Sequence, residues 1–324
     1  MTGPFQKNPL PDRPRLIFMG TPGFAVPTLR ALIDHGHEVV CVITQPDRPK
    51  GRGKKLAASP VKGLAKENGI EVLQPERASE EGFCELVELK EPELIIVVAF
   101  GQILKKRLLD IPKWGVVNVH ASLLPKYRGA APIQRAILNN ETKTGLTIMR
   151  MDEGLDMGPI LFQEEVPILK NETAGHLHDR LAERAGKLMV WSLEHMARNP
   201  ITEKPQDDAV ATYAPKIEKS LRRINWNESA VRISALIRAL DPRPGAYAVL
   251  EGQEVKFFSS RVVDSTGKDG VPGTAVGHRG GELVVQTGEG RVGIGEIQYP
   301  GKKRLPADDF LRGYELPEGT ELGK

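Results

Sequence analysis

The sequence predicts an α/β protein in which a doubly wound, mostly parallel, Rossmann-like sheet domain is followed by a small β-barrel domain. Three observations predict this organisation. Short apolar runs alternate with amphipathic ones from residue 15 to about residue 199, as in βαβ units. Near the end of that region, a long amphipathic stretch predicts a helix that begins at Thr173 as its N-cap. Beyond residue 219, short β-like runs alternate with glycine-rich turns, which is typical of a small barrel.

In the first region, apolar runs predict strands and the amphipathic runs between them predict helices. The predicted strands are residues 16–19, 39–44, 94–100, 116–119, 145–151 and 160–168. The predicted helices between the early strands are residues 25–35, 61–68 and 80–89. Because parallel strands end at one edge of a sheet, we expect a ligand crevice at their carboxyl ends.

The rest of the chain divides into three further parts. Residues 1–14 contain four prolines and no apolar core, so we interpret them as a disordered extension and not a signal peptide. Residues 200–218 have little apolar periodicity and are interpreted as a linker lying over the surface. Residues 219–324 contain a predicted helix at 229–240. The predicted strands after it are residues 246–250, 255–258, 273–276, 283–286 and 292–298.

The composition suits a soluble globular protein of two modest domains. The chain has 324 residues and a net charge of +3, which is only weak evidence for a nucleic-acid partner. Cys41 and Cys84 have no metal-ligand spacing, so we expect reduced packing residues and no metal. No apolar run is long enough to span a membrane. Neither a G-x-G-x-x-G fingerprint nor a Walker motif is present, so a nicotinamide or P-loop nucleotide site is not expected.

Asn118, His120 and Asp156 are the candidate catalytic residues. Asn118 and His120 are two apart at the end of a predicted buried strand, so their side chains project from one face. The Asn118 amide could donate to an oxygen that becomes negative, and His120 could donate or accept a proton. Asp156 follows in a glycine-flanked loop and could orient His120 or relay a proton. No Ser or Cys in these motifs is placed as a nucleophile, which favours direct attack by an amine.

Each candidate also has a structural interpretation. A single His is more often a satisfied core residue, and an Asp beside Gly often caps a turn. Asp152, in the same loop as Asp156, competes for the acidic role. The pairing of Asn118 with His120 favours catalysis over packing.

Longer motifs surround the candidates. They are Asn118-Val-His-Ala-Ser-Leu-Leu-Pro-Lys-Tyr-Arg-Gly-Ala-Ala-Pro-Ile-Gln134 and Gly145-Leu-Thr-Ile-Met-Arg-Met-Asp-Glu-Gly-Leu-Asp156, with further stretches at 18–24, 44–49, 51–56 and 98–104. Together they resemble the methionyl-tRNA formyltransferases, a branch of the folate-dependent formyltransferases, from about Arg15 through the carboxyl-terminal region. Gly23 and Met157 depart from that pattern, where an acidic residue and Thr are common. The resemblance implies an OB-like barrel for the second domain.

The resemblance implies transfer of the formyl group of 10-formyltetrahydrofolate to the α-amine of methionine on initiator tRNA. Asn118 and His120 would polarise the formyl oxygen, and Asp156 would act on the proton balance through His120. Two segments would hold the folate: Gly101, Gln102, Ile103 and Leu104, and Ser122, Leu123, Leu124 and Pro125. Lys126 and Arg128 could meet the folate's glutamate tail, the tRNA or water. A monomer in the bacterial cytoplasm is also implied.

Two basic clusters are candidate tRNA contacts. They comprise Arg48, Arg52, Lys54 and Lys55 in one loop, and Lys302, Lys303 and Arg304 in another. A charge cluster alone is often just a solvated loop. Glycines on both sides of Arg52 would let its side chain reach a phosphate or a base edge. In the resemblance, Arg52 would sense the weak first pair of the initiator acceptor stem.

We expect Arg52→Ala to weaken the discrimination of initiator from elongator methionine tRNA while the chemical step stays intact. Formylation of the two charged tRNAs by the purified variant measures this ratio. Equal losses on both tRNAs would reduce Arg52 to a general phosphate contact.

Two other functions remain open on the sequence alone. A formyltransferase acting on a small amine, such as a nucleotide sugar or glycinamide ribonucleotide, would need neither the basic loop nor a second domain of about a hundred residues. A non-catalytic tRNA-binding protein would not need Asn118, His120 and Asp156 together.

Overall fold

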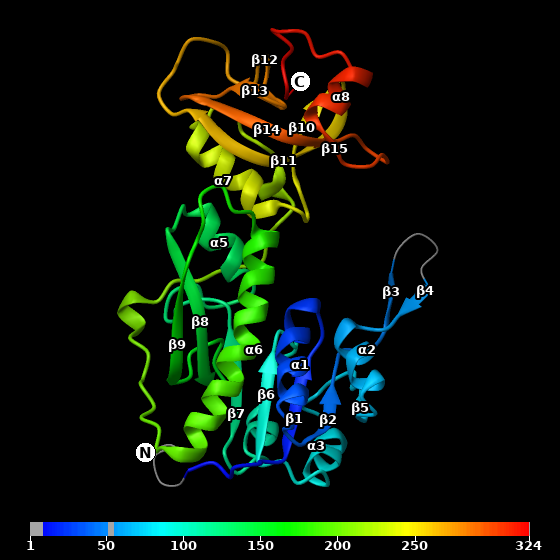
Figure 1. Cartoon of the computed structure of the whole chain (residues 1–324), viewed down its shortest axis with the longest axis vertical. Helices are drawn as coiled ribbons and strands as arrows, with labels where there is room; N and C mark the ends of the chain where they lie inside the picture. Colours follow the sequence, from blue (N-terminus) through cyan, green and yellow to red (C-terminus); the bar gives the residue numbers. More distant parts are fainter. Residues whose placement is uncertain (1–8, 51–54, 324) are drawn as a thin grey trace. The chain divides into compact units, whose positions relative to one another are not determined.

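The computed structural model describes residues 9–50 and 55–323 (Figure 1). The contacts divide the chain into two compact units. The first contains residues up to 129, 144–166 and 178–213, and the second contains 130–143, 167–177 and 214 onwards. The predicted tRNA contacts Arg52 and Lys54 lie outside the described residues, and Lys55 is described only by its backbone.

A seven-stranded sheet, in the order β5-β2-β1-β6-β7-β8-β9, forms the centre of the first unit. Its strands are β1 (Leu16–Gly20), β2 (Val39–Ile43), β5 (Val72–Leu73), β6 (Leu94–Val98), β7 (Val116–His120), β8 (Lys143–Arg150) and β9 (Ile160–Pro167). The pairs β1–β2, β1–β6, β2–β5 and β6–β7 are parallel, whereas β7–β8 is antiparallel. The sheet is therefore mixed, because the chain returns beside β7 through β8 and not through a further parallel crossover.

Helices connect and cover these strands (Figure 1). They are α1 (Val26–Asp34), α2 (Pro60–Glu67), α3 (Glu81–Glu88), α4 (Lys106–Leu109) and α6 (Ala174–Arg198), with 3-10 turns η2 (Gly23–Ala25) and η3 (Asp208–Val210). A short hairpin, β3 (Arg48–Lys50) and β4 (Lys55–Ala57), follows β2. The helix α6 packs closely on α1, since a Cβ at Gly186 would lie 2.8 Å from the carbonyl oxygen of Pro27.

The central strands are buried along their whole length. All five residues of β1, β6 and β7 are buried, which is why these strands are nearly continuous apolar runs. The first turn after β1 requires a residue without a Cβ, because a Cβ at Gly20 would lie 2.8 Å from that of Ala25. This close packing fixes the carboxyl edge of the sheet, the edge at which the predicted site residues stand.

The second unit contains an antiparallel sheet and three helices with their own core. Its elements are α5 (Pro132–Leu138), η4 (Ser220–Arg222), α7 (Ala230–Leu240), β10 (Ala246–Leu250), β11 (Gln253–Asp264), β12 (Ala275–Arg279), β13 (Glu282–Gln286), β14 (Arg291–Gln298), β15 (Leu305–Pro306) and α8 (Ala307–Gly313). The order is β10-β11-β14-β13-β12, with β15 on β14. Among the described strands no ladder joins β10 to β12, so the OB-like barrel stays a prediction. No helix in the described part of the chain is both long and apolar enough to cross a membrane.

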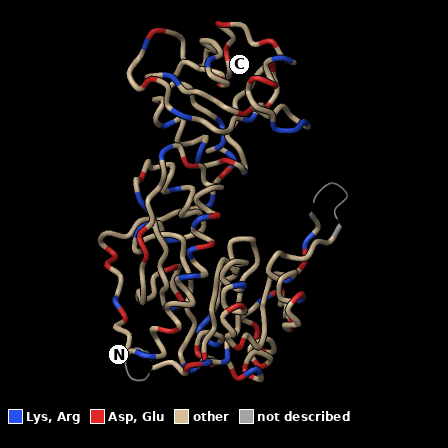
Figure 2. The backbone as a smooth tube through the Cα atoms, in the orientation of Figure 1, with Lys and Arg blue, Asp and Glu red and all other residues tan. Residues whose placement is uncertain are grey.

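Arg304, a predicted tRNA contact, is engaged within the second unit. Its guanidinium pairs with Asp241 at 2.8 Å, contacts Glu296, and lies 4.1 Å over the ring of Phe258. Lys302 and Lys303, in contrast, are exposed on the loop after β14, where Figure 2 shows a blue segment. Arg304 is therefore positioned to hold this loop, and the two lysines are the members of the cluster that face solvent.

We expect Arg304→Met to destabilise the second unit by about 3 kcal/mol, because it leaves the buried Asp241 carboxylate without its partner. Burial alone would raise the pKa of Glu296, but hydrogen bonds from Ser259 and Arg304 hold it below its usual value. That stabilisation is present above the ordinary carboxyl pKa and is lost as the pH falls. Denaturant unfolding of the variant and wild type at several pH values measures both effects. An unfolding free energy unchanged at neutral pH would contradict the structural role.

Candidate active site

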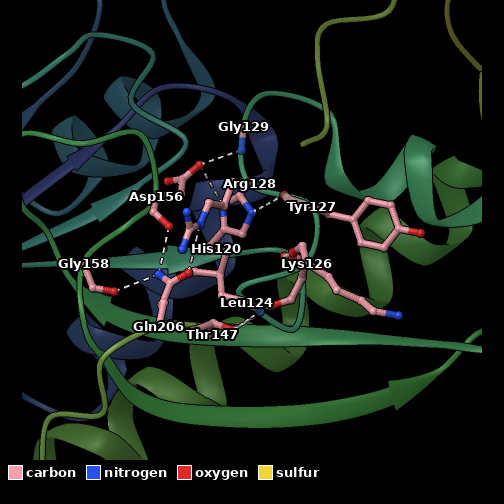
Figure 3. Close-up of polar contacts among 11 residues, drawn as sticks. His120, Leu124, Lys126, Tyr127, Arg128, Gly129, Thr147, Asp156, Gly158 and Gln206 are labelled. Carbon is pink, nitrogen blue, oxygen red and sulfur yellow. Dashed lines mark hydrogen bonds and ion pairs between the residues drawn. The ribbon is translucent and has the colours of Figure 1, made fainter. Parts of the chain in front are cut away.

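His120 ends β7 with its ring buried and its orientation fixed (Figure 3). The ring atom Nε2 lies 2.9 Å from the carbonyl oxygen of Tyr127. A carbonyl oxygen only accepts hydrogen bonds, so Nε2 carries a proton and donates it there. Nδ1 faces the carboxylate of Asp156, with 3.6 Å between Nδ1 and Oδ2. Nδ1 is therefore the ring atom available for proton exchange.

Asp156 is held in a conformation that few residues adopt. Its φ of 54° lies in the left-handed region, and its carboxylate reaches His120 at the end of β7. Its Oδ2 accepts a hydrogen bond from the backbone N–H of Gly129 at 2.8 Å. The loop returns tightly to β8, since a Cβ at Gly158 would lie 1.8 Å from the carbonyl oxygen of Arg150. Asp152, the sequence competitor, instead caps its own loop by accepting from Gly154 N at 2.9 Å.

Asn118 lies two residues before His120 on the same face of β7. Its side chain is 8% exposed. No hydrogen bond from its amide to any residue of the described part of the chain is present. A nearly buried donor without a protein partner is costly unless a ligand or water satisfies it. The amide is thus free to donate to an incoming oxygen.

The loop after β7 wraps around His120 and is fixed by side chains from other strands. Thr147 on β8 donates to the carbonyl of Ser122 at 2.7 Å and accepts from Leu124 N at 3.1 Å. Gln163 on β9 donates to the carbonyl of Leu124 at 2.8 Å. The Ser122 hydroxyl donates to the carbonyl of Lys126 at 2.6 Å, so it is occupied in holding the loop. The peptide bond between Leu124 and Pro125 is cis.

The segment expected to be a surface linker contacts this loop closely. Thr212 accepts from Tyr127 N through its hydroxyl at 2.9 Å and from Arg128 N through its carbonyl at 2.9 Å. Gln206 accepts from Arg128 Nε at 3.0 Å and donates to the carbonyl of Asp156 at 2.9 Å. Gln206 and Thr212 therefore hold the loop after β7 and the Asp156 loop from this segment.

Arg128 has a definite place, although the sequence left its partner open. Its side chain is 1% exposed, and its guanidinium reaches Gln206 and Asp208, the latter at 2.8 Å. The charge of Arg128 is thus compensated within the first unit. Lys126 is drawn pointing away from His120 in Figure 3.

A cavity of about 510 Å³ opens at the carboxyl ends of β1, β2 and β6. It is lined by Thr21, Pro22, Gln45, Pro46, Arg48, Pro49, Ala57, Ala58, Ser59, Pro60, Ala99, Phe100 and Gly101. Asn118, His120 and Asp156 are not among these residues, but β6 pairs with β7 and Val97 faces Asn118 across that pair. The cavity therefore adjoins the site along the same sheet edge, and the predicted Arg48 and Gly101 line it.

The wall beside the cavity is fixed by two glutamines. Gln74 donates to the carbonyl of Gln45 at 2.8 Å and to Asp47 at 2.9 Å. A hydrogen bond from Lys62 holds the pKa of the Asp47 carboxyl below its usual value. Gln102 ties its own loop to the segment before α3, accepting from Ala78 N at 2.7 Å.

The predicted folate segments differ in what they expose. Gly101 adopts a φ of 88° and Ile103 is 81% exposed, whereas Leu104 is buried. Accessible backbone beside an exposed apolar side chain suits a flat heterocycle with polar edges. In the second segment, Ser122 and Leu124 are buried by the contacts that fix the loop. The residues present are thus compatible with a folate, with the free Asn118 amide as a donor.

The structure brings His120 and Asp156 together and places Asn118 two residues before His120 on β7, and it adds residues that sequence reasoning missed. Thr147, Gln163, Gln206 and Thr212 hold the loops that carry the candidates. Thr147 lies within the motif from Gly145 to Asp156, but nothing in the pattern of that motif indicated which groups Thr147 would bind. Gln206 stood in a segment without periodicity and gave no signal. The catalytic roles stay predictions.

The fold and sequence define a formyl transferase with a separate carboxyl-terminal domain. A family model described as "Formyl transferase" matches residues 14–193, and one described as "Formyl transferase, C-terminal domain" matches residues 216–315. A methionyl-tRNA formyltransferase of Pelobacter propionicus is 49% identical over 308 residues, covering 95% of this chain and 96% of its own. The chain belongs to the methionyl-tRNA formyltransferase family, which confirms the resemblance drawn from its motifs.

More distant solved structures share the fold. HypX from Aquifex aeolicus in complex with tetrahydrofolic acid has a TM-score of 0.64 at 20% identity, covering 92% of this chain and 47% of that one. An N-formyltransferase from Helicobacter canadensis, in complex with folinic acid and dTDP-3-aminofucose, has a TM-score of 0.66 at 22% identity, covering 88% of this chain and 99% of that one. At these identities the likeness concerns the fold alone.

Proposed function

We propose that this protein transfers the formyl group of 10-formyltetrahydrofolate to the α-amino group of methionyl initiator tRNA. Membership of the methionyl-tRNA formyltransferase family supports the reaction and the acceptor. The observation that carries the chemistry is the free Asn118 amide on the same strand face as the His120–Asp156 pair. In this role the protein acts in the bacterial cytoplasm, as a monomer.

The chain's residues would promote direct attack by the amine on the formyl carbon. The new carbon–nitrogen bond would form as the bond from that carbon to N10 of the folate breaks, with the amine losing a proton and N10 gaining one. The Asn118 amide would donate to the formyl oxygen as negative charge develops there. His120, with Nε2 committed to the Tyr127 carbonyl, would exchange the amine's proton through Nδ1, backed by Asp156. The hydroxyl of Ser122 is committed to a backbone carbonyl, which favours direct transfer over a covalent intermediate on that residue.

The proposed function also assigns roles to the regions of the chain and to the predicted folate and tRNA contacts. Residues 15–199 would perform formyl transfer, with the 200–218 segment leading to a tRNA-binding region at 219–324. The Gly101–Leu104 and Ser122–Pro125 segments would hold the folate, through exposed backbone in the first and a fixed loop in the second. Arg48, which lines the cavity, and the exposed Lys302 and Lys303 would contact the tRNA backbone.

The deciding experiment follows labelled formyl from 10-formyltetrahydrofolate to methionine-charged initiator tRNA. Charged elongator methionine tRNA and a free amine, such as a nucleotide amino sugar, serve as comparison acceptors. We expect rapid labelling confined to the initiator tRNA. Labelling of the free amine alone would overturn the acceptor and leave the donor chemistry in place. Folate binding without transfer to any acceptor would overturn the enzymatic function.

A further inference from the structure

We propose that Gln206 is a positioning residue for the reaction: it holds the Asp156 loop so that the carboxylate faces His120. This inference rests on the proposed function and assigns a positioning role to the segment between the two matched family regions. Residue 206 falls outside both matched ranges, 14–193 and 216–315.

The side-chain amide of Gln206 links the Asp156 loop to Arg128 in the loop after β7 (Figure 3). Its Nε2 donates to the carbonyl oxygens of Asp156 at 2.9 Å and Gly158 at 2.8 Å. Its Oε1 accepts from Nε of the buried Arg128 at 3.0 Å. The amide thus uses both of its N–H groups and one acceptor position on residues of the site.

The contacts of Gln206 act on the backbone at Asp156 itself. Asp156 has a φ of 54°, a conformation that costs a non-glycine residue free energy and persists only when its surroundings hold it. The peptide carbonyls on either side of the turn are those that Gln206 binds. Without these two N–H groups, the contacts that remain on the carboxylate among the described residues are the Gly129 N–H hydrogen bond and the pair with His120.

The three hydrogen bonds of the Gln206 side chain, here called the clamp, also reach His120 through Arg128. Arg128 follows Tyr127, whose carbonyl accepts from His120, and precedes Gly129, whose N–H binds Asp156. Fixing the Arg128 side chain through Gln206 therefore fixes the backbone that orients both catalytic groups. A shift of about 1 Å in such a pair can cost roughly 100-fold in rate, so the clamp matters for the chemistry as well as for folding.

Two variants test the proposal. Gln206→Leu removes the donor and the acceptor, and Gln206→Glu keeps an acceptor for Arg128 but presents a carboxylate to the two carbonyls. We expect each to lower kcat by about 10- to 100-fold, with KM for both substrates changed by less than about twofold. Thr202→Ala, at an exposed position of the same segment, is the matched control and should keep wild-type kinetics.

A double-mutant cycle separates positioning from general stability. If Gln206 acts through Asp156, then Gln206→Glu should cause no further loss of kcat in an Asp156→Asn background. A further loss as large as in the wild-type background would overturn the proposal, as would wild-type kcat in both Gln206 variants. Hydrogen exchange at Gly129 N–H, which donates to Asp156, should be faster in the Gln206 variants than in wild type.

The exchange measurement also keeps the test separate from the proposed function. If wild-type protein formylates no tRNA, the proposed function fails. The rate of hydrogen exchange at Gly129 N–H then decides by itself whether Gln206 holds the loop. Unchanged protection of Gly129 in both variants would then overturn the positioning role.

Discussion

Asn118→Ala is expected to lower kcat by about 100- to 1000-fold, the loss typical of removing one well-placed oxyanion donor. The fold should survive, because the amide has no hydrogen-bond partner among the described residues and its removal leaves none unpaired. KM for the folate should change little, since the donor acts mainly where charge develops in the transition state. Steady-state formylation of methionyl initiator tRNA measures the loss, and circular dichroism checks the fold.

The matched control for this variant is Asn68→Ala. Asn68 ends α2 and donates to the carbonyl of Leu64 at 2.9 Å, away from the strand ends. This control should lose a little stability and keep its turnover, which is the reverse of the pattern expected for Asn118. Near-normal turnover in Asn118→Ala would remove the oxyanion role.

Asp156→Asn is expected to lower kcat by about 100- to 10,000-fold, the range of general acid–base contributions. The substitution preserves shape, and Asn can still accept from Gly129 N–H, so the loop should keep its conformation. What is lost is the negative charge 3.6 Å from Nδ1 of His120. The pH dependence of kcat should also change, because the substitution alters the pair proposed to exchange the amine's proton.

Asp152→Asn provides the control in the same loop. Its carboxylate is exposed and accepts from Gly154 N, which an Asn oxygen also does. Turnover close to wild type in Asp152→Asn beside a large loss in Asp156→Asn would decide between the two acidic residues of the loop. Equal losses in the two variants would contradict the assignment of Asp156.

Much of the fold could be predicted because the central strands are buried on both faces. Such strands are continuous apolar runs, so β1, β2, β6 and β7 were expected within one or two residues of their ends. The antiparallel insertion of β8 was not expected, because strand direction depends on how the chain returns and not on local pattern. The hairpin of β3 and β4 was also missed, since its basic and proline-rich residues resemble a loop.

Site residues could be predicted only where suitable side-chain chemistry and the two-residue repeat of a strand occur together. Asn118 and His120 stand two apart on a strand, a spacing that geometry alone places on one face. The partners that hold them are long-range: Gln163 lies 39 residues from Leu124, and Gln206 lies 78 residues from Arg128. Their side chains are polar residues in ordinary surroundings, so nothing in the local sequence marks them.

The hydrogen bond between Tyr127 and Thr212 spans 85 residues of sequence. During synthesis the strand bearing Asn118 and His120 leaves the ribosome long before the segment that braces it. The candidate site is therefore completed by one of the last parts of the first unit to be made, and contacts of such long range form slowly. A nascent chain released before residue 206 would carry every candidate catalytic residue and yet lack the parts that hold them.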